Sequence, residues 1–130
     1  MLKNFFLLLN VVVISFGDDG YYYAFGKKVF LSPLNNSSSY QKLTQKRYYK
    51  TSKNLIVSVE NTIIIKLKKE TSLAFILKKY HLTLKQKLTQ TLYLVKTSYT
   101  SKLFTLTNTI HTDKMIVYAH PNFTRKIINR

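Results

Sequence analysis

The chain has 130 residues, with 21 Lys and Arg against 5 Asp and Glu, a formal net charge of +16, and no cysteine. This length allows one domain with a modest core, and the lack of cysteine excludes disulfides, thiolate metal sites and cysteine nucleophiles. An apolar content of 45% argues against wholesale disorder. A field this positive attracts polyanions, so we expect nucleic acid as the partner, ahead of an anionic membrane surface.

The composition also carries a trace of the coding DNA. Phe, Tyr, Met, Ile, Asn and Lys, whose codons are rich in A and T, supply 57 residues, whereas Gly, Ala, Arg and Pro supply 11. Lysine outnumbers arginine 18 to 3, although both carry the same charge. We infer an AT-rich genome, most simply that of an organelle, and therefore expect a mitochondrial protein. An AT-rich nuclear genome would leave the same trace.

Residues 1–26 form a separate apolar segment with a net charge of −1. The run Phe5–Phe16 is too short for a membrane-spanning helix, which needs about 20 apolar residues. It has the length of a signal-peptide core, but Met1 is still present. The run is therefore expected to be either a buried strand or helix of the fold or an apolar contact with a neighbouring subunit, and we favour the contact. Tyr21–Tyr23 could stack on bases, although a packing cluster within a strand is favoured.

Residues 27–54 are expected to form a basic arm. From residue 32 onward this segment is Ser- and Asn-rich and then Lys-rich, and it holds too little apolar surface to fold alone. Its basic side chains, interleaved with tyrosines, predict an arm that orders on RNA; a solvated linker is the alternative. The candidate RNA contacts in this arm are Lys42, Lys46, Arg47 and Lys50.

The remaining residues, 55–130, show the clearest periodicity. Alternation from Leu55 to Leu67 predicts one or two strands with one buried face. Ser72 is a plausible N-cap for an amphipathic helix whose apolar stripe runs to Leu88. A strand follows at Leu92–Val95, then a Thr-rich stretch and a short apolar run to Ala119. We therefore expect an α+β fold in which a βαβ unit carries a long polar extension.

The sequence contains no recognisable catalytic pattern. The three histidines lack metal-ligand spacing, the five carboxylates suggest no converging pair, and no nucleophile elbow or Gly-rich phosphate loop occurs. We therefore expect a protein that is not an enzyme, with no cofactor, no metal and no small-molecule substrate.

Two stretches resemble the family of the tenth protein of the ribosomal small subunit. Ile63–Lys69 (IIIKLKK) is similar to that family's first strand, roughly I-R-I-R-L-K-S/A. Ile116–Lys126 (IVYAHPNFTRK) resembles its hairpin-tip motif, roughly T-V-L-R-S-P-H-V-N-K-K, and Leu106–Asn108 falls near the family's L-P-T. A rival resemblance links Ser58–Ile64 (SVENTII) to the S-F-N-N-T-I-V of the eleventh small-subunit protein.

The resemblance to the tenth protein covers about residues 60–130 and implies half of a ferredoxin-like domain. It predicts a partial βαβ unit with a hairpin-like extension and an N-terminal extension, completed by a second chain or by N-terminal residues. The hairpin tip would reach into the head of the small subunit. The RNA contacts that we add for residues 55–130 are Lys66, Lys68, Lys69, His120, Pro121, Thr124, Arg125 and Lys126.

These features predict a structural component of the mitochondrial ribosomal small subunit, located in the matrix. It would bind rRNA and other mitochondrial ribosomal proteins. The alternative is an accessory subunit of a mitochondrial respiratory membrane complex, anchored through Phe5–Phe16.

Overall fold

The computed structural model describes residues 18–34, 46–98 and 100–125. A four-stranded antiparallel sheet forms the centre of the molecule. In sheet order its strands are β7 (Thr83–Lys87), β8 (Leu92–Lys96), β6 (Thr62–Leu67) and β9 (Ile116–Pro121). The strand β6 is central because it pairs with β8 on one side and with β9 on the other. The predicted strands at 55–67 and 92–95 are both confirmed.

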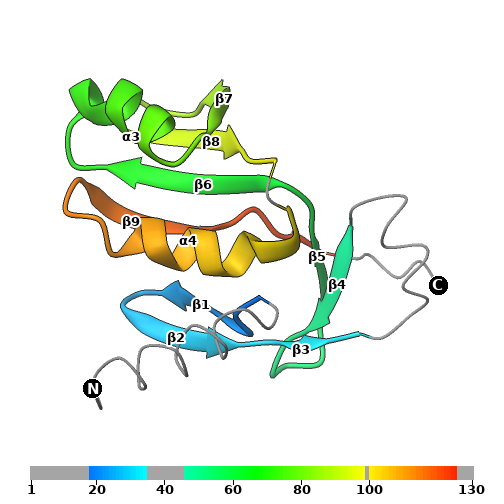
Figure 1. The fold of residues 1–130 in the computed structure, drawn as a ribbon. Helices are drawn as coiled ribbons and strands as arrows, with labels where there is room; N and C mark the ends of the chain where they lie inside the picture. Colours follow the sequence, from blue (N-terminus) through cyan, green and yellow to red (C-terminus); the bar gives the residue numbers. More distant parts are fainter. Residues whose placement is uncertain (1–17, 35–45, 99, 126–130) are drawn as a thin grey trace, which may run out of the picture.

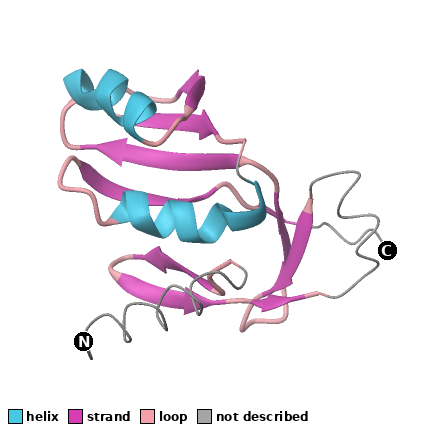
Figure 2. Ribbon diagram, in the orientation of Figure 1, coloured by secondary structure: helices cyan, strands magenta, loops and turns pink. Residues whose placement is uncertain are grey.

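Two helices cover one face of this sheet, α3 (Leu73–Lys79) and α4 (Leu103–His111), each entered through a short 3-10 turn, Glu70–Ser72 and Thr100–Lys102 (Figures 1 and 2). The order β6-α3-β7-β8-α4-β9, with β9 beside β6, is the complete ferredoxin-like βαββαβ arrangement. The α+β class is therefore confirmed.

The expectation of a partial unit with a long polar extension is wrong. The Thr-rich stretch forms α4, and the apolar run after it supplies the fourth strand, β9. The described chain thus contributes all six elements, so no second chain is needed to complete this sheet. The amphipathic pattern of α4 is not evident in the sequence, because the polar residue Thr107 occupies a core position between the buried Phe104 and Ile110.

The core lies between the helices and the covered face of the sheet. Alternate residues of β6 and β8, among them Ile63, Ile65 and Val95, are completely buried. Phe104 from α4 and Ile76 from α3 are equally inaccessible to solvent. Burying a side chain of this size stabilises a fold by about 1.5–3 kcal/mol, so the covered face specifies the register of each strand.

The helix α3 is shorter than its apolar stripe predicts. Ser72 does occupy the N-cap, although its hydroxyl makes no capping hydrogen bond. At the other end His81 adopts a left-handed conformation (φ 55°), and the Leu82 N–H donates to the Leu77 carbonyl, which closes the helix as a Schellman motif. The residues beyond Leu82, expected to continue the helix, form the exposed edge strand β7.

A second antiparallel sheet and a hairpin flank the central sheet. In sheet order the strands of the second sheet are β10 (Thr124–Arg125), β5 (Ile56–Val59), β4 (Arg47–Lys50) and β3 (Ser32–Pro33). The hairpin consists of β1 (Tyr21–Ala24) and β2 (Lys27–Phe30) and lies beside α4 and β9 (Figure 1).

The expected basic arm, which was to order only on RNA, is already folded in part of its described residues 27–34 and 46–54. They pair within these two sheets, and Tyr49 is buried against Phe104. The favoured interpretation of Tyr21–Tyr23 as a packing cluster is confirmed, because Tyr22 packs on Phe123 and Tyr23 on His111. The segment 1–17, including the run Phe5–Phe16, lies outside the described residues, as do residues 35–45.

The helix α4 begins at a carboxylate that is distant in sequence. Its N-cap residue is Lys102, which makes no side-chain capping bond and places a positive charge at the positive end of the helix dipole. Asp18 replaces the missing cap, because its carboxylate accepts hydrogen bonds from the N–H groups of Phe104 (2.9 Å) and Thr105 (2.7 Å). Its side chain is only 8% exposed and also pairs with Arg47 at 3.2 Å.

Replacing Asp18 should destabilise the whole domain. Asp18→Ala removes a helix cap and two charge-assisted hydrogen bonds and leaves the Arg47 guanidinium without this partner, which should cost about 2–4 kcal/mol. Urea unfolding followed by circular dichroism measures this loss. The control Glu70→Ala removes the same charge from an exposed side chain and should change stability by no more than about 0.5 kcal/mol. Equal losses in both variants would contradict the capping role of Asp18.

A second carboxylate joins the end of α4 to α3. Asp113, in the loop after α4, accepts hydrogen bonds from the Met115 N–H, the Tyr80 hydroxyl and the Lys79 ammonium group. Burial disfavours its charged form, but these hydrogen bonds outweigh that cost and lower the pKa of Asp113 from 3.8 to about 2.

This pKa predicts an acid-dependent loss of stability. Since the folded-state pKa of Asp113 lies below its unfolded value, its contribution is complete above about pH 4 and declines as the pH falls toward about 2. The difference in unfolding free energy between wild type and Asp113→Asn should therefore shrink over that interval in urea titrations. A difference that stays constant between pH 5 and pH 2 would contradict the lowered pKa.

Candidate nucleic-acid interface

The central sheet has a second face that neither described helix covers. Along β6, the residues between the buried positions are Ile64 and Lys66, and both are partly exposed. Ile64 pairs with Leu94 of β8 and His120 of β9, and Lys66 pairs with Leu92 and Tyr118. Opposed residues share a face of a sheet. We call this surface the open face; its residues are Ile64, Lys66, Leu92, Leu94, Lys96, Tyr118 and His120.

The open face combines positive charge with aromatic rings. Lys96 is exposed and Lys66 is half-buried, and no residue of the open face is acidic. The rings of Tyr118 and His120 stack, with centroids 5.6 Å apart and planes 13° from parallel. Lysines that bind phosphates, next to planar rings on which bases stack, are the elements with which proteins bind single-stranded nucleic acid.

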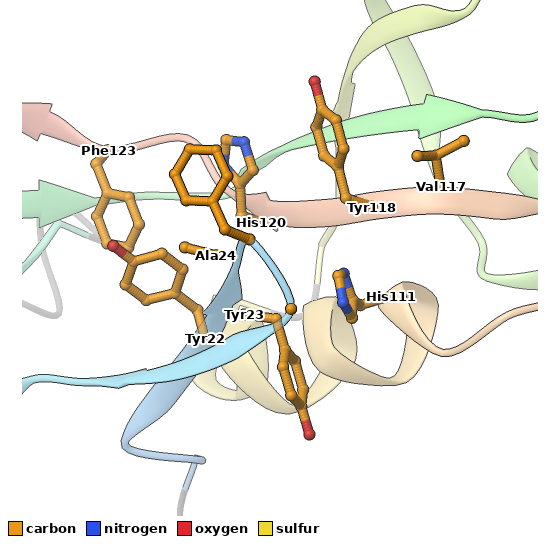
Figure 3. A pocket seen from close by; sticks show the side chains of 10 residues that line it. Tyr22, Tyr23, Ala24, His111, Val117, Tyr118, His120 and Phe123 are labelled. Carbon is orange, nitrogen blue, oxygen red and sulfur yellow. The ribbon is translucent and has the colours of Figure 1, made fainter.

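A cavity of about 550 Å³ adjoins the open face at β9 (Figure 3). Tyr118 and His120 form part of its wall together with Tyr22, Tyr23, Ala24 and Phe123, and His111 enters it from the end of α4. Phe25, Gly26 and Val117 complete the lining. The cavity exists because the hairpin β1–β2 packs beside α4 and β9 without hydrogen-bonding to β9 as a further strand.

The two histidines of the cavity present opposite hydrogen-bonding groups. The Ala119 N–H donates to Nδ1 of His111 (3.1 Å), so a neutral His111 carries its proton on Nε2. Burial lowers the pKa of His111 and so favours this neutral form. Nδ1 of His120 lies 3.0 Å from the Pro121 carbonyl oxygen and must donate to it, which makes Nε2 the acceptor in neutral His120.

The hairpin turn beside the cavity has an unusual residue. Phe25 and Gly26 connect β1 to β2 with positive φ angles of 52° and 75°, as a two-residue type I′ turn requires. Glycine adopts such angles freely, whereas for a bulky residue like Phe25 they cost of order 1 kcal/mol. The Phe25 side chain is nevertheless fully exposed at the rim of the cavity.

The structure separates the sequence-predicted RNA contacts into several groups. Lys66 and His120 lie together on the open face, and Lys68 and Lys69 follow at the exposed end of β6. Lys50, Thr124 and Arg125 are exposed on the second sheet.

Three other predicted contacts are engaged within the fold. Lys46 lies 3.8 Å from Glu60, Arg47 pairs with Asp18, and Pro121 is buried on the helix-covered face. Lys42 and Lys126 lie outside the described residues.

Sequence reasoning missed four residues of this region, Phe25, Lys96, His111 and Tyr118. The alternation within β9 could have placed Tyr118 on the same face as His120. For Phe25 and His111 no such signal exists, because their proximity depends on the packing of the hairpin against α4.

Within the described ranges, no three His, Asp or Glu side chains converge into a metal site. None of the helices in this part of the chain has the length and apolar character needed to cross a membrane. The sequence matches no protein-family model, and no curated protein or solved structure is significantly similar to it. The function of the chain therefore has to be argued from the open face, the cavity and the charge.

Proposed function

We propose that this protein is a structural component of the mitochondrial ribosomal small subunit that binds rRNA and neighbouring ribosomal proteins. The single observation that carries the RNA-binding part is the open face, where lysines and stacked rings lie on a sheet that no described helix covers. The net charge of +16 supports the ribosomal assignment, and so does the resemblance of Ile63–Lys69 to the first strand of the tenth small-subunit protein, since β6 is the first strand of the βαββαβ order. The resemblance of Ile116–Lys126 to a hairpin tip gives no support, because Ile116–Pro121 is the strand β9 of the central sheet.

The role is mechanical and electrostatic. Each lysine that contacts a phosphate releases condensed counterions, so the affinity falls linearly with the logarithm of the salt concentration. The sheet holds Lys66 on β6 and Lys96 on β8. The rings of Tyr118 and His120 on β9, on the other side of β6 from Lys96, favour unpaired bases over a regular duplex.

Charge reversal on the open face should weaken RNA binding specifically. Lys66→Glu with Lys96→Glu should reduce the slope of log affinity against log salt by about two, since each lysine accounts for about one phosphate contact. Fluorescence anisotropy with small-subunit rRNA transcripts measures this slope. The matched control, Lys78→Glu with Lys114→Glu, changes the net charge equally but alters exposed side chains of α3 and of the loop before β9. If both pairs reduce the slope equally, binding depends on net charge alone.

Fractionation of mitochondria tests the ribosomal assignment itself. The protein should sediment with small subunits in sucrose gradients and leave them when the rRNA is digested. Migration with a respiratory complex on a native gel, in place of sedimentation with small subunits, would overturn the proposal in favour of the accessory-subunit alternative.

A further inference from the structure

We propose that the cavity between the hairpin turn and β9 binds one unstacked base of single-stranded RNA. The inference rests on the proposed function and goes further, since it assigns a subsite and the class of ligand that occupies it. Three independent features of the cavity point to a base: its exposed turn residue, its aromatic walls and its hydrogen-bonding groups.

The first feature is Phe25. An aromatic residue with positive φ is strained, and such strain persists where the surrounding structure or a function maintains it. Within the described residues no ring contact compensates for this strain, because the Phe25 side chain is fully exposed. A fully exposed aromatic ring held on a rigid two-residue turn is suited to stacking on a planar partner.

The second feature is the shape and chemistry of the walls. A volume of about 550 Å³ falls within the range of about 300–1,000 Å³ that is typical of small-molecule sites. Tyr118 and His120 offer a stacked pair of rings, and Tyr22 and Phe123 form a second pair with centroids 4.8 Å apart. Aromatic walls of this kind accept any base, because every base has a π face.

The third feature is polarity. In their neutral forms His111 offers an N–H donor and His120 a ring-nitrogen acceptor, and the edge of a nucleobase carries both kinds of group. None of the described lining residues is acidic. Lys27 and Lys28 follow the turn directly and are exposed, and Lys66 pairs with Tyr118 across the sheet. The phosphate of a nucleotide whose base is bound there would therefore have lysines on the neighbouring strands β2 and β6, from which an uncharged apolar segment would gain nothing.

The test uses the full chain and a short single-stranded RNA that contains one 2-aminopurine, whose fluorescence falls when the base stacks. Wild type should quench this fluorescence. Phe25→Gly should weaken binding about 5- to 150-fold, the range found when one base–aromatic stack is lost. The slope of affinity against salt should not change, because no phosphate contact is removed. Tyr118→Leu should act in the same direction.

Phe25→Gly is an informative variant because glycine adopts the required φ freely, so its thermal stability should equal or exceed that of wild type. Loss of binding then cannot result from unfolding. The matched control is Phe75→Ala, which removes an exposed ring from α3, outside the cavity, and should leave both affinity and quenching unchanged. A duplex of the same sequence should bind wild type and Phe25→Gly equally.

The outcomes separate this inference from the proposed function. If wild type does not bind RNA at all, the proposed function fails. If wild type binds with steep salt dependence but Phe25→Gly binds equally well and 2-aminopurine is not quenched, the cavity assignment is wrong and the open face alone binds RNA. If a free mononucleotide competes as effectively as the oligonucleotide, the cavity is a small-molecule site and the assignment to RNA is overturned.

Discussion

The carboxylate of Asp18 joins three parts of the molecule that are far apart in the sequence. It lies at the entrance to the hairpin β1–β2, caps the first N–H groups of α4 and pairs with Arg47 of β4. The next residues strengthen the same junction, since the Asn108 side chain donates to the Tyr21 carbonyl. This junction, together with the packing of Tyr22 on Phe123 and of Tyr23 on His111, holds the hairpin beside α4 and β9 and so maintains the cavity beneath its turn.

The sequence predicts a strand or helix correctly where the spacing of apolar residues within that element marks its buried face. The alternation from Leu55 to Leu67 predicted two strands correctly because most of the buried positions there are apolar, namely Val59, Ile63, Ile65 and Leu67. The helix α4 was not predictable in this way, since threonine fills one of its core positions and its cap is supplied from Asp18, 86 residues before Phe104. Because helix α4 depends on such long-range contacts, local sequence patterns alone predicted only part of the fold.

The candidate site shows the same division. Net charge pointed to a polyanion, and Lys66 and His120 do lie on one open surface. Adjacent residues of a strand do not share a surface, however, because side chains alternate between the two faces of a sheet. Pro121 follows His120 but is buried on the opposite face. Arg47 was assigned to RNA from its basic surroundings, yet its guanidinium pairs with the nearly buried carboxylate of Asp18. The cavity combines the hairpin, α4 and β9, and no single segment encodes it.

The edge strand β7 has a consequence for how the protein behaves before it reaches a partner. An exposed sheet edge ordinarily invites another strand to pair with it, which leads to aggregation. Here all five residues of β7 are exposed, Lys85 and Lys87 lie among them, and its register with β8 shifts between Leu84 and Gln86. Two copies that met along β7 would bring their lysines together at an irregular strand, so this edge of the sheet disfavours pairing with a second copy while remaining attractive to a polyanion.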